Sequence, residues 1–194
     1  MKVFASKRNR VFLDGGVVYK ERPDESAAEF EAAYLSSLKQ KGVAVPEVLS
    51  IEGRVLRMEY VDGVPLPDYL DEKDSVFSCD RTAEFISDWF ESFYTAVSHS
   101  ESKEIRGDVN GRNFIVTAVG VTGVDFEARV FGKRETDLGG LLAFVDSYSY
   151  EDDGAQRALE RELLKSFMKR FSLGEDELLE EKTKELRAMA LRRK

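Results

Sequence analysis

Short alternating apolar runs fill the first third of the chain and predict antiparallel strands. We expect strands over residues 2–5, 10–13, 17–20, 48–51 and 55–60. Asp14-Gly15-Gly16 and Glu52-Gly53 separate neighbouring runs, and such residues favour hairpin turns. Residues 43–48 contain Pro46, which indicates a loop or an edge strand. The beginning of the chain is therefore predicted to form a small antiparallel sheet.

A helical pattern interrupts these strands after Pro23. Ser26 and Glu29 have the spacing of a capping box, which predicts a helix that begins at Ser26, runs to about residue 41 and stops at Gly42. We expect its apolar stripe to consist of Ala27, Phe30, Tyr34, Leu35 and Leu38.

One acid, Glu31, falls inside this apolar stripe. A carboxylate in a core-facing position needs a partner, because burial of an unpaired charge is costly. Lys20 ends the strand before the helix and is the obvious candidate. The alternative is that Glu31 reaches water at the edge of the stripe.

Helical periodicity dominates the remainder of the chain. Helices are predicted over residues 67–71, 80–98, 138–146 and 155–171, with a last, highly charged one after Gly174. Asp80 and Asp137 are the expected N-caps of two of them. Aromatic residues recur at helical spacing within 80–98, which favours a core face over a base-stacking surface. A hairpin is expected over residues 114–125, and a loop over 130–134.

The change from strands to helices coincides with a segment that contains Gly63 and Pro65. This segment is the best candidate for a boundary between lobes. The sequence thus predicts an α+β protein with an N-terminal sheet-and-helix lobe at 1–61 and a mainly helical lobe at 62–194.

Composition narrows the class of protein. The chain has 194 residues, a net charge of −8, 42% hydrophobic and 34% charged residues, as in ordinary globular proteins. We expect no membrane span and no signal peptide, because no apolar run approaches the necessary length. A single cysteine, Cys79, and a single histidine, His99, exclude an internal disulfide and a cysteine- or histidine-based metal cluster. We therefore expect a cytoplasmic protein, and the acidic balance argues against direct nucleic-acid binding.

The candidate chemistry lies around the predicted hairpin at 114–125. Asp108 and Asn113 precede the first apolar run, and Asp125 follows the second. Such a hairpin can bring three oxygen-bearing side chains together, and Mg²⁺ prefers oxygen ligands. The alternative is that residues 108–113 form a surface turn and Asp125 is an ordinary loop residue, since short motifs match by chance.

These features occur in an order that resembles the protein-kinase-like fold, and in particular the aminoglycoside and choline phosphotransferase branch. The compact second lobe is closer in size to RIO-like kinases and to the small kinase of the KEOPS complex. The resemblance covers roughly residues 3–145 and implies an ATP- and Mg²⁺-dependent phosphotransferase acting on a hydroxyl.

The resemblance also implies residue roles. Lys20 matches the phosphate-binding lysine and Glu31 its helix partner. Asp108 matches the catalytic aspartate, while Asn113 and Asp125 match the metal ligands. The hinge segment Met58-Glu59-Tyr60-Val61-Asp62-Gly63 implies adenine binding by the carbonyl of Glu59 and the amide of Val61. Asp137 matches the aspartate that braces the catalytic loop.

The chain departs from the family pattern at several places. The loop at residues 6–9 has no glycine, Arg106 stands where histidine is frequent, and Asn110 lies where protein kinases have a lysine. The segment between Asp125 and Asp137 is short, which favours a small-molecule hydroxyl acceptor or a single serine presented by a protein. We expect acceptor contacts from residues 68–80 and 148–154.

Three hypotheses remain open from the sequence. The first is a phosphotransferase acting on a small molecule. The second is a nucleotide-binding pseudokinase module, prompted by the glycine-free loop and Arg106. The third is an atypical serine/threonine kinase working in a complex, with the basic end at 187–194 as a docking tail; a solvated charged face is the alternative for that end.

Overall fold

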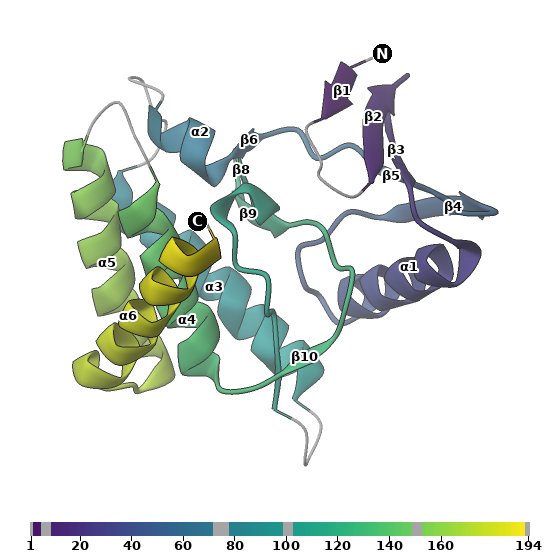
Figure 1. The fold of residues 1–194 in the computed structure, drawn as a ribbon. Coiled ribbons are helices and arrows are strands. Elements are labelled where there is room, and N and C mark those ends of the chain that lie inside the picture. Colours follow the sequence, from purple (N-terminus) through teal and green to yellow (C-terminus); the bar gives the residue numbers. More distant parts are fainter. Residues whose placement is uncertain (1, 5–8, 72–77, 99–102, 149–152, 193–194) are drawn as a thin grey trace.

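The N-terminal part of the chain forms an antiparallel sheet with one helix beside it (Figure 1). The structure, a computed structural model, describes residues 2–4, 9–71, 78–98, 103–148 and 153–192. The five strands run in the order β1-β2-β3-β5-β4, so β3 is central. Their bounds are Lys2–Phe4 (β1), Arg10–Asp14 (β2), Val17–Glu21 (β3), Val48–Glu52 (β4) and Val55–Glu59 (β5). Both predicted hairpin turns are confirmed by the pairing of β2 with β3 and of β4 with β5.

Helix α1 (Glu25–Gln40) connects β3 to β4. Its N-cap is Asp24, whose carboxylate accepts a hydrogen bond from the amide of Ala27 at 2.8 Å. The predicted Ser26 capping box is therefore wrong, because an aspartate two residues earlier caps the helix and Ser26 lies within the first turn. The predicted apolar stripe is also partly wrong, since Phe30 is exposed and Ala28 and Ala32 are buried instead.

The C-terminal part is mainly helical and contains two further small sheets (Figure 1). The helices are α2 (Leu66–Asp71), α3 (Cys79–Val97), α4 (Arg134–Ser147), α5 (Asp153–Phe171) and α6 (Glu175–Arg192). The strands are β6 (Val64–Pro65), β7 (Glu104–Ile105), β8 (Phe114–Thr117), β9 (Gly120–Gly123) and β10 (Val130–Phe131). The expected hairpin between residues 114 and 125 is confirmed as β8 and β9. The protein is therefore α+β, as predicted from the sequence.

Several predicted boundaries differ from the structure. The N-cap position of α3 is Ser78 rather than Asp80. Helix α4 starts at Arg134, so Asp137 lies inside the helix and does not cap it. The expected loop at 130–134 includes strand β10, which pairs with β7. His99 and residues 6–8 of the glycine-free loop lie outside the described residues.

The aromatic face of α3 is core, as its periodicity predicted. Trp89, Phe90 and Phe93 are almost completely buried. The Trp89 ring packs edge-on against Phe114 of β8 at a centroid distance of 5.2 Å, and its centroid lies 6.3 Å from that of Phe126. Aromatic packing therefore fixes the hairpin, and the segment that follows it, against α3.

The segment after α1 is bonded to the helical part of the molecule. The carbonyl of Ala44 accepts hydrogen bonds from the indole Nε1 of Trp89 at 2.9 Å and from the amide of Gly123 at 3.0 Å. Val43 and Val45 on either side are buried. The chain from α1 to β4 is thus held against α3 and β9 before it returns to the sheet.

No helix in the described part of the chain is both long and apolar enough to cross a bilayer.

Candidate active site

Lys20 and Glu31 form a buried ion pair between the central strand and helix α1. The Lys20 Nζ lies 2.7 Å from Glu31 Oε1, and both side chains are at most 5% exposed. Burial opposes the charged form of Lys20, but the carboxylates of Glu31 and Asp125 raise its pKa above the ordinary value. The alternative in which Glu31 meets water is therefore wrong.

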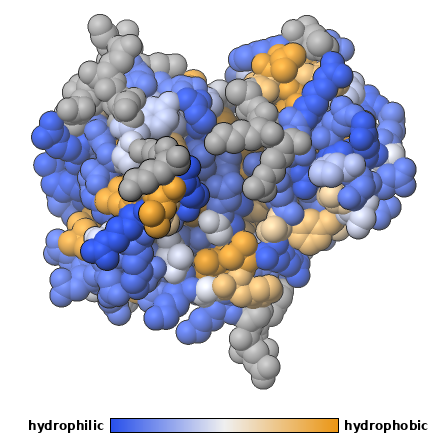
Figure 2. All heavy atoms as spheres, viewed as in Figure 1, coloured by the Kyte–Doolittle hydropathy of each residue, from blue (hydrophilic) through white to orange (hydrophobic). Residues whose placement is uncertain are grey.

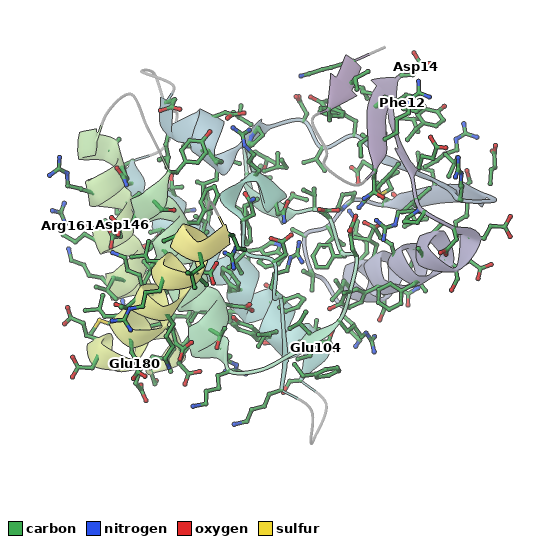
Figure 3. The ribbon with its side chains drawn as sticks, in the orientation of Figure 1. Phe12, Asp14, Glu104, Asp146, Arg161 and Glu180 are labelled. Atoms are coloured by element: carbon green, nitrogen blue, oxygen red, sulfur yellow. The ribbon has the colours of Figure 1, made fainter. Side chains whose placement is uncertain are left out.

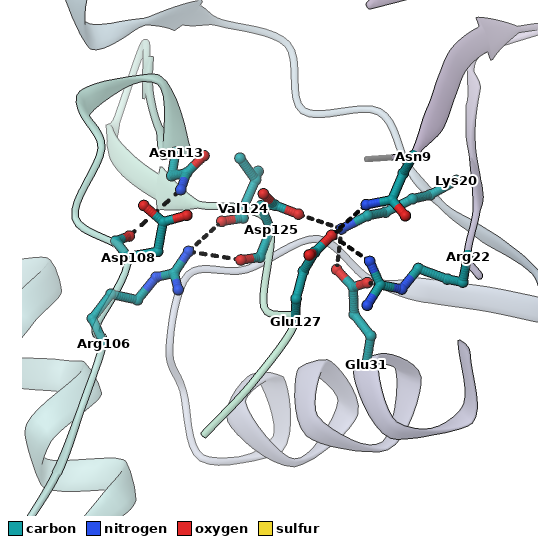
Figure 4. Close-up of polar contacts among 10 residues, drawn as sticks. All are labelled: Asn9, Lys20, Arg22, Glu31, Arg106, Asp108, Asn113, Val124, Asp125 and Glu127. Carbon is teal, nitrogen blue, oxygen red and sulfur yellow. Dashed lines mark hydrogen bonds and ion pairs between the residues drawn. The ribbon is translucent and has the colours of Figure 1, made fainter. Parts of the chain in front are cut away.

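The Asp125 side chain reaches the same lysine from the segment after β9. Its Oδ1 accepts a hydrogen bond from Lys20 Nζ, and its carboxylate remains partly exposed. Figure 4 shows Lys20 and Glu31 on one side of this contact and Asp108 and Asn113 on the other. Asp125 thus lies between the sheet lysine and the loop that precedes β8.

Two further residues, Arg22 and Glu127, complete the charged cluster and were missed from the sequence. Glu127 Oε1 lies 3.0 Å from Lys20 Nζ and also accepts hydrogen bonds from Arg22 and Asn9. Arg22 Nε lies 3.2 Å from Glu31 Oε2. Burial would raise the pKa of Glu127, but the two cations outweigh it and lower that pKa to about 2. The sequence did contain a signal for them. Arg22 follows Lys20 by two positions and Glu127 follows Asp125 by two positions, and side chains two positions apart in an extended chain point to the same side.

The loop that carries Asp108 is held from below by Asp137. The Asp137 carboxylate accepts hydrogen bonds from the backbone amides of Arg106 at 2.6 Å and Gly107 at 2.8 Å. The hydroxyl of Tyr94 donates a third, at 3.0 Å. Burial raises the pKa of Asp137, and these three donors oppose that effect. Asp137 was wrongly expected to cap a helix. Its carboxylate is used on this loop instead, as the sequence resemblance implied.

Asp108 and Asn113 lie at the exposed end of this loop. Among the residues that the structure describes, the Asp108 carboxylate accepts one long hydrogen bond, from the amide of Asn110 at 3.3 Å. Asn113 is the last residue of the short 3₁₀ helix Gly111–Asn113, and its side-chain Nδ2 lies 3.5 Å from the backbone carbonyl oxygen of Asp108. The Asp108 side chain is exposed and that of Asn113 is half-buried, so Asp108 is the more accessible of the two to a ligand.

Arg106 joins the Asp108 loop to the Asp125 loop. Its guanidinium donates to the carbonyl oxygens of Val124 at 2.7 Å and Asp125 at 2.9 Å, and it lies 4.2 Å from the centroid of the Phe126 ring. Asp125 itself has a φ of 68°, an uncommon value for a residue with a side chain. Complete burial lowers the pKa of Arg106, although nearby carboxylates oppose this. Arg106, at the position where the sequence resemblance led us to expect a histidine, therefore holds the uncommon backbone conformation of Asp125.

Tyr34 links helix α1 to the same loops. It lies one turn after Glu31, and its hydroxyl donates to the buried carboxylate of Glu104 in β7, a residue labelled in Figure 3. Its ring packs edge-on against Phe126 at a centroid distance of 5.6 Å. The helix that positions Glu31 is thereby tied to the start of the Asp108 loop.

Glu59 and Val61 lie apart from these charged contacts. The Glu59 amide donates to the carbonyl of Glu47 at 2.9 Å, and its carboxylate accepts from the Glu47 amide at 3.1 Å and lies 3.4 Å from Lys39 Nζ. Glu59 pairs with Val17, three residues before Lys20 on β3. Their role in adenine binding stays a prediction.

The donor set at this site fits a hard cation such as Mg²⁺. Asp125 and Asn113 offer a carboxylate and an amide oxygen, and Mg²⁺ usually takes one or two carboxylates and completes its shell with water and phosphate. The described residues contain no group of three or more His, Cys, Asp or Glu side chains arranged to hold a metal ion.

Comparison with known protein families and structures places this site in context. Residues 18–137, more than half of the chain, match the model of the RIO domain. The chain belongs to the RIO-domain family. Every predicted site residue from Lys20 to Asp125, and Asp137 as well, falls within the RIO domain. No curated protein sequence matches significantly.

Solved structures with the same fold include three phosphotransferase-related proteins. A ternary complex of streptomycin, ATP and APH(2")-IIa has a TM-score of 0.60 and 14% identity over 86% of this chain and 78% of that chain. The ADP-bound aminoglycoside phosphotransferase APH(2'')-Ib has a TM-score of 0.58 and 12% identity over 95% and 91%. A choline/ethanolamine kinase family protein from Mesorhizobium loti has a TM-score of 0.53 and 16% identity over 84% and 69%.

These likenesses establish a protein-kinase-like fold for the RIO domain, as the order of the sequence motifs indicated. At such low identity they show the fold alone. The family and fold support a kinase-type enzyme, and the acceptor is a separate question.

Proposed function

We propose that the protein is an ATP- and Mg²⁺-dependent phosphotransferase that moves the γ-phosphoryl group to a hydroxyl of a small molecule. The observation that carries the proposal is the contact of Lys20, held by Glu31, with Asp125, next to the loop of Asp108 and Asn113. Two of the structural neighbours are complexes with ATP or ADP. Domain-wise, we assign the nucleotide-binding lobe to 1–61 and the catalytic and acceptor lobe to 62–194.

Each residue has a distinct task in this proposal. Bound ATP and Mg²⁺ supply the phosphoryl group and neutralise its charge. Lys20 orients phosphate oxygens, while Asn113 and Asp125 provide the oxygen ligands for the metal. Asp108 accepts a hydrogen bond from the acceptor hydroxyl, orients it, and takes its proton late in the transfer. The Glu59 carbonyl and the Val61 amide hold the adenine.

The Asp108→Asn variant tests this assignment. It keeps the shape of the side chain and removes the proton acceptor, so turnover should fall by about a hundredfold or more, in the range for a lost general base. ATP affinity, measured by thermal shift with Mg²⁺, should stay within about threefold of the wild type. Near-normal turnover of Asp108→Asn on an identified acceptor would show that the catalytic assignment is wrong.

A second candidate is an atypical kinase that phosphorylates a protein serine, and the RIO-domain match favours it. A panel of metabolites and a panel of serine-containing proteins distinguish the two, with ADP release as the common readout. Nucleotide binding without turnover on either panel would instead support a pseudokinase module.

A further inference from the structure

An exposed surface around β10 combines apolar and basic side chains. We define the β10 surface by the exposed residues of and around this strand, which are Val130, Phe131, Lys103, Arg129, Lys133 and Arg134. Phe131 is 59% exposed and Val130 is 37% exposed. Figure 2 shows an apolar patch at the lower centre of the molecule, in the region where Figure 1 places β10. Large apolar side chains gathered beside cations are typical of a binding surface.

The charge of this surface is opposite to that of the whole chain. Four cations gather here, whereas the chain carries a net charge of −8. One of them, Arg129, lies 3.7 Å from the buried carboxylate of Glu104 but keeps a half-exposed side chain. The β10 surface is therefore a basic region on an acidic protein, which favours an acidic partner.

One of these cations, Lys133, stands at a position that does not favour the helix. Lys133 is the N-cap of α4 and makes no side-chain capping bond, whereas the guanidinium of Arg134, the first residue of the helix, lies 5.0 Å from the centroid of the Tyr94 ring. The N-terminus of a helix carries partial positive charge, so cations there are unfavourable. Glu135 in the first turn offsets part of this effect, whereas the carboxylate of Asp137 is bonded to the loop before Asp108. Helix stability therefore does not explain the lysine at position 133.

Strand β10 also offers backbone groups to a partner. It pairs with β7 on one side, and within the described residues no strand pairs with its other edge. An exposed strand edge can pair with an extended polypeptide through backbone hydrogen bonds. We propose that the β10 surface docks an extended acidic polypeptide segment of a partner protein, with an apolar side chain of that segment covering Phe131.

The occupant of this surface would lie beside the catalytic loop. Val130 pairs with Ile105, three residues before Asp108, and a Cβ added at Gly107 would meet Val130 Cγ2 at 2.5 Å. The proposal nevertheless goes beyond the proposed phosphotransfer, because docking needs neither nucleotide nor turnover. A polypeptide is favoured over a nucleic acid because the edge of β10 offers backbone hydrogen-bonding groups that an extended polypeptide can pair with.

Fluorescence anisotropy of labelled probes on the full chain, without ATP, tests this docking. The probes are a short peptide rich in Glu and Asp with a central phenylalanine, the same peptide with glycine in place of phenylalanine, and polyuridine RNA. We expect micromolar binding of the first peptide, weakened by salt, and binding of the glycine peptide weaker by about tenfold. Polyuridine should bind more weakly than either acidic peptide.

Surface variants connect any binding to β10. Phe131→Ser and Lys133→Glu should each weaken binding of the phenylalanine-containing peptide by about fivefold to tenfold, as expected for the loss of one apolar or charged contact. Val119→Ser, at a side chain 88% exposed in another turn, and Lys169→Glu, at an exposed position on α5, are matched controls and should leave binding unchanged. Thermal unfolding of all four variants verifies that they are folded.

The outcomes separate clearly. Three results would each overturn the proposal. They are absence of peptide binding, equal losses of binding in the test and control variants, and tighter binding of polyuridine than of the peptides through the same residues. Loss of phosphotransfer in Asp108→Asn bears only on the proposed function, because that variant should bind the acidic peptide as well as the wild type does.

Discussion

Replacement of Asp137 by asparagine removes the charge that holds the catalytic loop while keeping the size of the side chain. In the native protein one carboxylate oxygen accepts from the Arg106 amide and the Tyr94 hydroxyl, and the other accepts from the Gly107 amide. An asparagine provides a single acceptor oxygen. If it faces Arg106, its NH₂ group faces the amide of Gly107, and two donors then meet in a buried place.

The cost follows from these contacts. A buried amide left unpaired costs about 1–3 kcal/mol, and the remaining hydrogen bonds lose the strength that a charged acceptor gives, about 1 kcal/mol in total. Relief of the burial of a carboxylate, which raises the pKa of Asp137, offsets part of this. We expect Asp137→Asn to lower the free energy of unfolding by about 2–3 kcal/mol.

Urea unfolding followed by circular dichroism measures this change. Tyr94→Phe is the control, because it removes one donor and leaves both backbone amides bonded; it should cost about 1 kcal/mol. Turnover should fall in Asp137→Asn by more than in Tyr94→Phe, since only the former releases the backbone that carries Asp108. A free energy of unfolding within about 0.5 kcal/mol of the wild type would refute this account of the loop.

Three further predictions concern neighbouring positions. Gly107→Ala should cost about 1–3 kcal/mol more than Gly15→Ala in urea unfolding, because both glycines have positive φ but only at Gly107 would the new Cβ meet Val130; equal losses would contradict the clash. Glu127→Gln should lower stability near neutral pH by about 1 kcal/mol after solvent screening. The folded-state pKa of Glu127 is lowered from 4.5 to about 2, so this difference from the wild type should be complete above pH 4.5 and disappear as the pH falls toward 2; a difference independent of pH would refute it. Arg106→Lys should reduce turnover by about tenfold or more, because lysine cannot reproduce the paired hydrogen bonds to two carbonyls, and unchanged kinetics would show that these bonds do not position the loop.

The contact between Lys20 and Glu31 could be predicted from the sequence because its cause is local. An acid on the apolar face of a helix must find a partner, and a lysine ends the preceding strand. The strands and hairpins were predictable for a similar reason, since alternation and turn residues act within a few positions. Order along the chain then indicated the kinase-like fold.

Asp137 shows what local reasoning cannot supply. An aspartate before an apolar helical run is typical of an N-cap, but its partners lie 30 and 31 residues earlier, in the loop at Arg106 and Gly107. Arg22 and Glu127 were missed for the same reason: they are in contact but lie 105 residues apart in the sequence. The roles of the site residues in binding and catalysis stay predictions.

The double hydrogen bond at the Ala44 carbonyl has a mechanical consequence. Without it, the sheet and α1 would be connected to the helices by backbone only at residues 60–63, between β5 and β6. The bonds from Trp89 and Gly123 add a second anchor on the other side of α1. The sheet and α1 are also held by the contacts of Lys20 with Asp125 and of Tyr34 with Glu104. Movement of the sheet relative to the helices therefore requires more than a bend at residues 60–63, because it has to break these bonds as well.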